Sequence, residues 1–92
     1  MISVNHNFTY MWVGNIEGWI FDNSEGKSLA LNSTALRIFK KMLDGKNCDQ
    51  IINDFCIQCG KTRTEIAPSV ERACRAIIAF GVFKNAGKEI CV

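Results

Sequence analysis

The sequence of 92 residues contains little of the side-chain chemistry that enzymes use. It has a single histidine, His6, a single proline and no glycine-rich loop of the kind that cradles phosphates. Local spacing places no Ser–His–acid or Cys–His arrangement, and no carboxylate pair stands out in an expected cleft. We therefore expect a protein that is not an enzyme, and that has no cofactor or metal site of its own.

Long hydrophobic runs are also missing. The longest strictly apolar run, 76–80, is far too short to cross a bilayer. The first seven residues have neither the basic start nor the apolar stretch of a signal peptide. We expect a cytoplasmic protein without a membrane partner. In that compartment the five cysteines are expected to be thiols rather than a disulfide framework.

Strong charge of one sign is absent as well. Eleven Lys and Arg stand against nine Asp and Glu, for a net charge of +2, which gives no strong attraction to nucleic acid. Residues 33–63 are mildly basic, with six Lys and Arg against three Asp. A solvated helix face is the simpler interpretation of this asymmetry.

What is present is an ordinary globular composition. The hydrophobic fraction is 48% and the charged fraction is 22%, values that argue against intrinsic disorder. The length suffices for one modest core. We therefore expect a single domain over residues 1–92, with its core at about residues 8–84.

The first third of the chain predicts strands. Phe8–Val13, Gly18–Asp22 and Lys27–Leu31 are rich in β-branched, aromatic or alternating apolar residues. Gly14-Asn15 and Asn23–Gly26 separate them with turn chemistry. Three short runs with short polar breaks predict an antiparallel three-stranded meander.

At Asn32 the apolar period changes from two to 3.6, which predicts helices for the rest of the chain. Asn32 is a good N-cap for a first helix that ends at Gly45, and Asn47 with Gln50 is compatible with a capping box for a second. A third helix is expected to begin at Thr64 or at Ala67, and Pro68 favours the later start. The fold class is therefore α+β, a meander followed by three helices, similar to a winged helix-turn-helix.

The cysteine pair Cys56-x-x-Cys59 is a possible redox or metal motif. It lies at the C-terminal end of the expected second helix, where the helix dipole does not stabilise a thiolate. Cys48, Cys74 and Cys91 form no second pair of this spacing that would complete a zinc site. Packing of both thiols on the apolar stripe is the favoured interpretation, and a metal or redox role stays open.

One function that this architecture allows is DNA binding by a winged helix. Its recognition helix would need basic and amide side chains gathered on one exposed face. The expected third helix offers only Arg72 and Arg75, interleaved with Glu71. Nucleic acid is therefore a less favoured partner than a peptide.

The third strand, Lys27–Leu31, has an outer edge that a simple meander leaves unpaired. Natural proteins usually protect such an edge or use it, and this strand has one lysine and no proline. An open edge can accept a peptide as an added strand, with affinity from main-chain hydrogen bonds. Coverage by the chain's own tail is the other possibility.

Motifs from residue 18 onward resemble those of PqqD-like proteins in their order and spacing. Leu29–Ala35, Ile38-Phe39 and Leu43–Lys46 resemble the family signature "LN-x-T/S-A … LDG". The similarity spans residues 8–84 and also includes these segments: Gly18–Asp22 with Gly26-Lys27, Ile51-Ile52 before Cys56, and Val70, Ala73, Cys74 and Ile77 before Gly81-Val82-Phe83. The chain departs from the family at Cys48, Cys56, Cys59 and Cys74, where smaller polar or aliphatic residues are usual.

The resemblance implies three antiparallel strands with three helices, and a function as recognition element of ribosomally made, later modified peptides. Such domains bind the leader of a precursor peptide as an added strand and present it to a modifying enzyme, often a radical S-adenosylmethionine enzyme. The implied peptide-binding residues lie on the third strand and the third helix: Lys27, Ser28, Leu29, Ala30, Leu31, Val70, Glu71, Cys74, Arg75 and Ile78. An open edge also permits pairing with a second copy of the chain.

Overall fold

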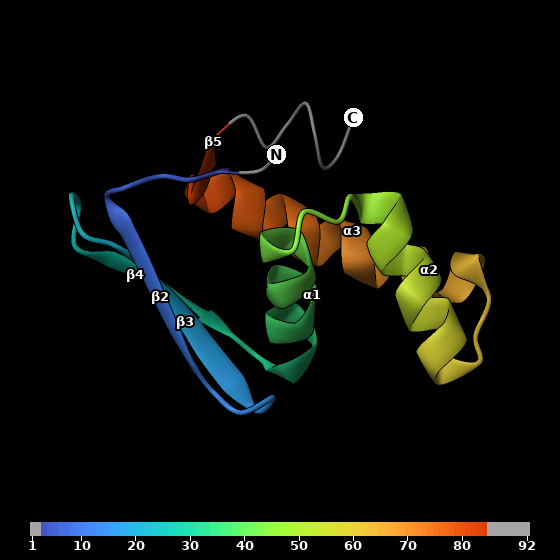
Figure 1. Ribbon diagram of the computed structural model, residues 1–92. Coiled ribbons are helices and arrows are strands. Elements are labelled where there is room, and N and C mark those ends of the chain that lie inside the picture. Colours follow the sequence, from blue (N-terminus) through green and yellow to red (C-terminus); the bar gives the residue numbers. More distant parts are fainter. Residues whose placement is uncertain (1–2, 85–92) are drawn as a thin grey trace.

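A computed structural model describes residues 3–84, and Figure 1 shows its arrangement. Three strands come first, three helices follow, and two short strands flank this core. In chain order the elements are β1 (Ser3–Val4), β2 (Phe8–Val13), β3 (Glu17–Asp22), β4 (Lys27–Leu31), α1 (Ser33–Leu43), α2 (Cys48–Cys59), α3 (Arg63–Phe80) and β5 (Phe83–Lys84). The α+β prediction of a meander followed by three helices is confirmed.

The meander has the strand order β2-β3-β4, with both contacts antiparallel. Its register aligns side chains in rows across the three strands, and each row lies on one face of the sheet. The rows Phe8–Asp22–Lys27, Tyr10–Ile20–Leu29 and Trp12–Gly18–Leu31 share the inner face. The rows Thr9–Phe21–Ser28 and Met11–Trp19–Ala30 share the outer face.

The helices cover the inner face alone (Figure 1). Tyr10 of β2 meets Phe39 of α1 edge-on, with 5.3 Å between ring centroids. α1 also approaches the sheet closely at Gly18, where an added Cβ would lie 2.9 Å from Cδ1 of Leu36. The buried core therefore lies between the inner face of the sheet and the helices, with members from β3, β4, all three helices and β5.

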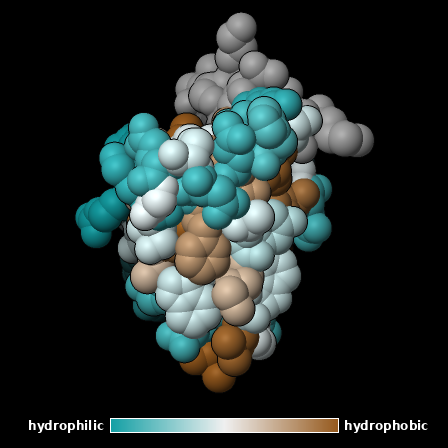
Figure 2. All heavy atoms as spheres, turned by 90° about the vertical axis from the view of Figure 1, so that its left-hand side faces the viewer, coloured by the Kyte–Doolittle hydropathy of each residue, from teal (hydrophilic) through white to brown (hydrophobic). Residues whose placement is uncertain are grey.

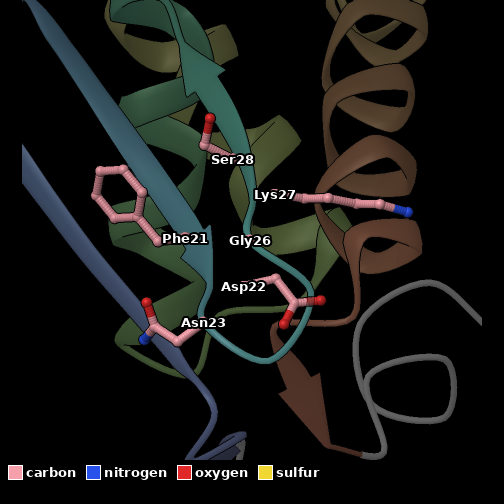
Figure 3. A pocket seen from close by; sticks show the side chains of 6 residues that line it. All are labelled: Phe21, Asp22, Asn23, Gly26, Lys27 and Ser28. Atoms are coloured by element: carbon pink, nitrogen blue, oxygen red, sulfur yellow. The ribbon is translucent and has the colours of Figure 1, made fainter.

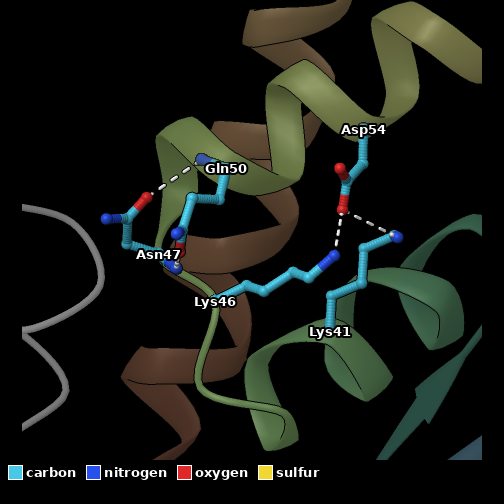
Figure 4. A network of polar contacts seen from close by, with 5 residues as sticks. All are labelled: Lys41, Lys46, Asn47, Gln50 and Asp54. Atoms are coloured by element: carbon cyan, nitrogen blue, oxygen red, sulfur yellow. Dashed lines mark hydrogen bonds and ion pairs between the residues drawn. The ribbon is translucent and has the colours of Figure 1, made fainter.

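The predicted helix caps are present on α1 and α2. The side chain of Asn32 accepts a hydrogen bond from the amide of Ala35 at 2.8 Å. Asn47 and Gln50 form a reciprocal capping box, with two bonds of 2.9 Å (Figure 4). These caps satisfy amides that the first turn of a helix leaves without an intrahelical partner.

An ionic contact joins α1 to α2. Oδ2 of Asp54 accepts hydrogen bonds from the ammonium groups of Lys46 and Lys41, the latter at 3.1 Å (Figure 4). The hydrogen bonds from Lys46 and then from Lys41 lower the pKa of Asp54 below its ordinary value. The basic side chains of this region therefore include two that hold the helices together.

The favoured start of the third helix, Ala67, is wrong by four residues, and the alternative start at Thr64 lies one residue from the observed one. α3 begins at Arg63, and Pro68 is its sixth residue. Arg63 binds the side chains of Asn53 and of Asp49 on α2, the latter at 2.7 Å, and these contacts hold the early turn in helical form. Pro68 lacks the N–H that would bond to the carbonyl four residues earlier, and its ring crowds that carbonyl. Its position is exposed, so water can bind the carbonyl instead.

The pairing of β1 with β5 has no counterpart in the sequence analysis. Ser3 pairs with Lys84 and Val4 with Phe83. The side chain of Asn5 also donates to the carbonyl of Gly81 at 2.6 Å. The start of the described chain is therefore tied to the segment after α3. No helix in residues 3–84 combines the length and the hydrophobicity needed to cross a membrane.

Candidate functional site

The outer edge of β4 is the candidate site. β4 pairs with β3 on one side, and within residues 3–84 no strand pairs with its other side. An unpaired edge presents backbone N–H and C=O groups that a further strand can bind. The possibility that the chain covers this edge with its own final residues lies outside the described residues.

The register shows which backbone groups of β4 point outward. The amide of Asn23 donates to the carbonyl of Asn7 at 2.9 Å, one step beyond the Phe8–Asp22 pair. Asn7 and Asn23 are thus a hydrogen-bonded pair, and such pairs alternate along an antiparallel ladder. Residues 21, 19 and 17 of β3 therefore bind β2, and the residues between them, 22, 20 and 18, direct their backbone groups to β4. The amide of Gly26 donates to the carbonyl of Asp22 at 2.9 Å, which agrees with this direction.

It follows that the β4 residues opposite these three bind β3 through their own backbone groups. They are Lys27, Leu29 and Leu31. Ser28 and Ala30 alternate with them, and therefore direct their N–H and C=O groups toward the outer edge. An added strand would be held by the backbone of Ser28 and Ala30.

The turn before β4 is built around one carboxylate. Oδ1 of Asp22 accepts hydrogen bonds from the hydroxyl of Ser24 at 2.7 Å, from the amide of Ser24 at 3.1 Å and from the amide of Glu25 at 3.3 Å. The bond from the Ser24 hydroxyl is the largest cause that lowers the pKa of Asp22. Asp22 therefore fixes the turn in its ionised form and sets where β4 begins.

A shallow hollow of about 280 Å³ lies at this end of β4 (Figure 3). Six residues of the β3–β4 hairpin line it: Phe21, Asp22, Asn23, Gly26, Lys27 and Ser28. Lys27 and Asp22 belong to the inner-face row of Phe8, whose ring meets Phe80 of α3 at 5.7 Å between centroids. The inner-face side chains at the beginning of β4 therefore lie on the side of the sheet where the end of α3 packs.

The implied peptide-binding residues separate into three groups by exposure. Lys27, Ser28, Ala30 and Arg75 are exposed, and Leu29, Glu71 and Ile78 are half-buried. Leu31, Val70 and Cys74 belong to the buried core. The first two groups therefore have side-chain surface that a ligand can reach, and the third group is part of the core.

Charge near α3 is modest. The guanidinium of Arg75 lies 3.9 Å from the carboxylate of Glu71, one helical turn earlier, and the side chain of Arg75 is well exposed while that of Glu71 is partly exposed. An exposed pair of this kind contributes at most a few tenths of a kcal/mol to helix stability. Arg75 is therefore able to turn toward a ligand carboxylate at little cost.

The four cysteines within residues 3–84 differ in exposure. Cys48 and Cys56 are half-buried, Cys74 is buried, and Cys59 is exposed. The prediction that Cys59 packs on the apolar stripe is wrong, because the last residue of α2 extends past the buried stretch of Ile51, Ile52 and Phe55. Across residues 3–84 there is no group of three or more His, Cys, Asp or Glu side chains placed to hold a metal ion.

The other edge of the sheet is a second exposed feature, which the sequence analysis treated only as an aromatic-rich strand. On β2 the exposed large hydrophobic residues are Tyr10, Met11, Trp12 and Val13. Figure 2 shows the face of the sheet turned away from the helices, with apolar atoms across its middle and at its lower end. The signal in the sequence was the run of six residues, 8–13, without a single charge.

No family model and no curated protein matches the sequence. Among solved structures the chain is similar to TbiB1, which was determined in complex with the TbiA(beta) leader peptide. The TM-score is 0.76 at 15% sequence identity, and the alignment covers 89% of this chain and 94% of TbiB1. The likeness covers nearly all of both chains, so this protein has the fold of TbiB1.

Proposed function

We propose that this protein is a PqqD-like recognition domain that binds the leader of a ribosomally made precursor peptide. The leader adds to the outer edge of β4 as a further antiparallel strand. The observation that carries the proposal is the outward direction of the Ser28 and Ala30 backbone groups, on an edge that no described strand occupies. The shared fold with a protein solved together with a leader peptide supports it.

Side chains would supply specificity. In an added strand every second side chain turns to the inner face, where Lys27 and Leu29 of β4 lie. Leu29 and Ile78 are both half-buried and both pack against the core, so an apolar leader side chain would extend that surface. Lys27, Glu71 and Arg75 place two positive charges and one negative charge around these apolar positions. A leader with alternating apolar residues and an acidic flank fits this arrangement.

The domain would act by binding, and the chemistry would belong to an enzyme that it serves. We propose a radical S-adenosylmethionine enzyme as that partner, with this chain as a non-catalytic carrier. The single histidine, His6, lies between β1 and β2 rather than on β4 or α3. Mass spectrometry of the precursor would show modification with enzyme and carrier together, and an unchanged mass with the carrier alone. A mass change caused by the carrier alone would refute the non-catalytic assignment.

The first test is a titration of isotopically labelled protein with leader peptides encoded beside its gene. We expect amide shifts concentrated at Lys27–Leu31 and at the exposed positions of α3, including Glu71, Arg75 and Ile78. A peptide of the same composition in scrambled order is the control, and it should leave these amides in place. Shifts confined to β2, or no shift with any neighbouring leader in the presence of the enzyme, would overturn the proposal.

A further inference from the structure

The edge formed by β2 is open in the same sense as the edge formed by β4. β2 pairs with β3, and nothing among the described strands pairs with its other side. The Asn7–Asn23 hydrogen bond fixes its pattern: Thr9, Met11 and Val13 bind β3. Tyr10 and Trp12 therefore direct their N–H and C=O groups outward, whereas the amide of Phe8 already donates to the carbonyl of Asn5 at 3.0 Å.

β2 has none of the devices that keep edge strands apart. Natural edges carry lysine, proline or bulges, and β2 (Phe8–Val13) contains neither a charged residue nor a proline. Tyr10 and Trp12 stack with 5.7 Å between ring centroids and 14° between their planes, and they are 40% and 38% exposed. Met11 and Val13 on the outer face are 53% and 50% exposed. Apolar surface thus borders the open backbone on both faces.

We infer that β2 pairs with β2 of a second copy of this chain, antiparallel and about a twofold axis, to form a continuous six-stranded sheet. The composition argues for a copy rather than another partner, because β2 itself has no charge and its apolar flanks on both faces are self-complementary. The ammonium of Lys40 on α1 lies over the Trp12 ring and is held by the Gly14 carbonyl and the Asn15 side chain. Outward-facing residues pair with outward-facing residues, so Tyr10 and Trp12 of one copy meet the same residues of the other. The helices of both copies then lie on one side of the sheet.

The expected association is weak and reversible. With roughly 150–250 Å² for an aromatic side chain, the exposed parts of Tyr10, Met11, Trp12 and Val13 amount to about 400 Å² per copy. This is about half of the roughly 800 Å² that each partner buries in a standard complex. The dimer would leave both β4 edges at the outer ends of the sheet, so this inference neither requires nor prevents peptide binding there.

The test is sedimentation velocity of the full chain without any peptide, from about 10 μM to about 1 mM, a range that brackets weak association. The wild type should show a reversible monomer–dimer equilibrium. Met11→Lys should weaken it at least about tenfold, because apolar burial is lost and like charges meet near the axis. Ala30→Lys is the matched control: residue 30 lies in the same row on the same face, at the opposite edge. It should dimerise as the wild type does.

Dilution of the labelled wild type provides a second measurement that needs no variant. Amide shifts with concentration should gather at Tyr10 and Trp12, whose outward N–H groups would change partners. A wild type that stays monomeric at about 1 mM overturns the inference. So does a dimer that Ala30→Lys disrupts and Met11→Lys leaves intact. Because no peptide is present, either failure leaves the proposed leader recognition untouched.

Discussion

The two edges of the three-stranded sheet are built for different partners. At β4 the outward backbone belongs to Ser28 and Ala30, whose side chains are small, beside an exposed lysine at position 27. At β2 it belongs to aromatic residues, Tyr10 and Trp12 among them, in a strand without charge. The first edge is well solvated, so a ligand can bind to it reversibly. The second edge exposes apolar surface to water unless a partner buries it.

The comparison teaches that strand pairing alone does not define a binding site. Both edges offer the same kind of backbone hydrogen bond, which contributes about 1 kcal/mol net because water competes for it, whereas a bond left unmade in a complex costs about 1–3 kcal/mol. These bonds therefore supply affinity at either edge without distinguishing one partner from another. Selectivity comes from the side chains beside them. To tell the functions of the two edges apart, the clearest substitutions are those that remove a backbone donor from one edge and leave the other edge unchanged.

The largest effect is expected from proline in β4. Leu29→Pro removes an N–H that points to β3, and should cost at least about 2 kcal/mol of unfolding free energy because a buried carbonyl loses its donor. Ala30→Pro removes an outward N–H. It should change stability by less than about 1 kcal/mol and weaken leader binding about tenfold or more. Urea unfolding and calorimetric titration measure the two quantities.

The opposite edge supplies the control for this pair. Tyr10→Pro removes an outward N–H from β2 together with a ring that packs on Phe39 and Trp12, so it should lower stability and abolish self-association. Under conditions where the variant is folded, its leader affinity should equal that of the wild type. If Ala30→Pro destabilised the fold as strongly as Leu29→Pro, the assignment of outward residues on β4 would be wrong. If it bound leader as the wild type does, β4 would not be the site.

A smaller effect is expected where α1 supports the β2 edge. Nζ of Lys40 lies 4.7 Å from the ring centroid of Trp12, and donates to the carbonyl of Gly14 at 2.9 Å and to Oδ1 of Asn15 at 2.8 Å. Lys40→Ala should lower the unfolding free energy by about 1 kcal/mol and weaken self-association, with leader affinity unchanged. Lys41→Ala is the control, because it makes the same charge change on the Asp54 side of the helix. Equal dimerisation by both variants would contradict a role for the Trp12 contact.

Much of the fold could be predicted because its signals are local. β2 and β4 have the predicted bounds, and β3 begins one residue earlier than predicted. The caps at Asn32 and Asn47 depend on side chains a few residues away, so spacing in the sequence was sufficient to find them. The candidate edge followed from the strand order of a simple meander.

The rest depends on contacts between residues far apart in the chain. The early start of α3 depends on Arg63 meeting Asp49 and Asn53, and the β1–β5 pair joins the two ends of the described chain. Whether the backbone groups of Ala30 or those of Leu29 point outward follows from the hydrogen-bonding pattern of the sheet, which the bond between Asn7 and Asn23 fixes. The periodicity of the third helix placed Val70 and Cys74 on its buried face, where the structure has them, but it could not tell which implied peptide-binding residues of that helix would face a peptide. Such features are set by tertiary packing rather than by local sequence.

A modest effect is expected from charge on the α3 side of the β4 edge. Arg75→Glu should weaken binding of an acidic leader about threefold, as exposed ion pairs contribute about 1 kcal/mol or less. Stability should change little, because the Arg75–Glu71 contact is 3.9 Å long and exposed. Lys61→Glu makes the same kind of charge reversal in the exposed connector before α3 and should leave affinity alone. Calorimetric titration at low and at physiological salt measures the effect. An affinity equal to that of the wild type at low salt would exclude Arg75 from the site.

The smallest effect is expected from pH acting on the turn that starts β4. Hydrogen bonds lower the pKa of Asp22 below its ordinary value of 3.8, so the ionised carboxylate stabilises the folded state. That contribution is complete above the ordinary value and is lost as pH falls through the lower value of the folded protein. The Tm of the wild type should therefore exceed that of Asp22→Asn at neutral pH, and the difference should shrink below about pH 4. Asp54 titrates in both proteins and cancels in the comparison. Self-association through β2, which has no carboxylate, should not follow this profile. A difference in Tm that stays constant down to about pH 2 would contradict a role for the carboxylate charge in the turn. The lower stability of Asp22→Asn would then come from the different hydrogen-bonding groups of its side-chain amide.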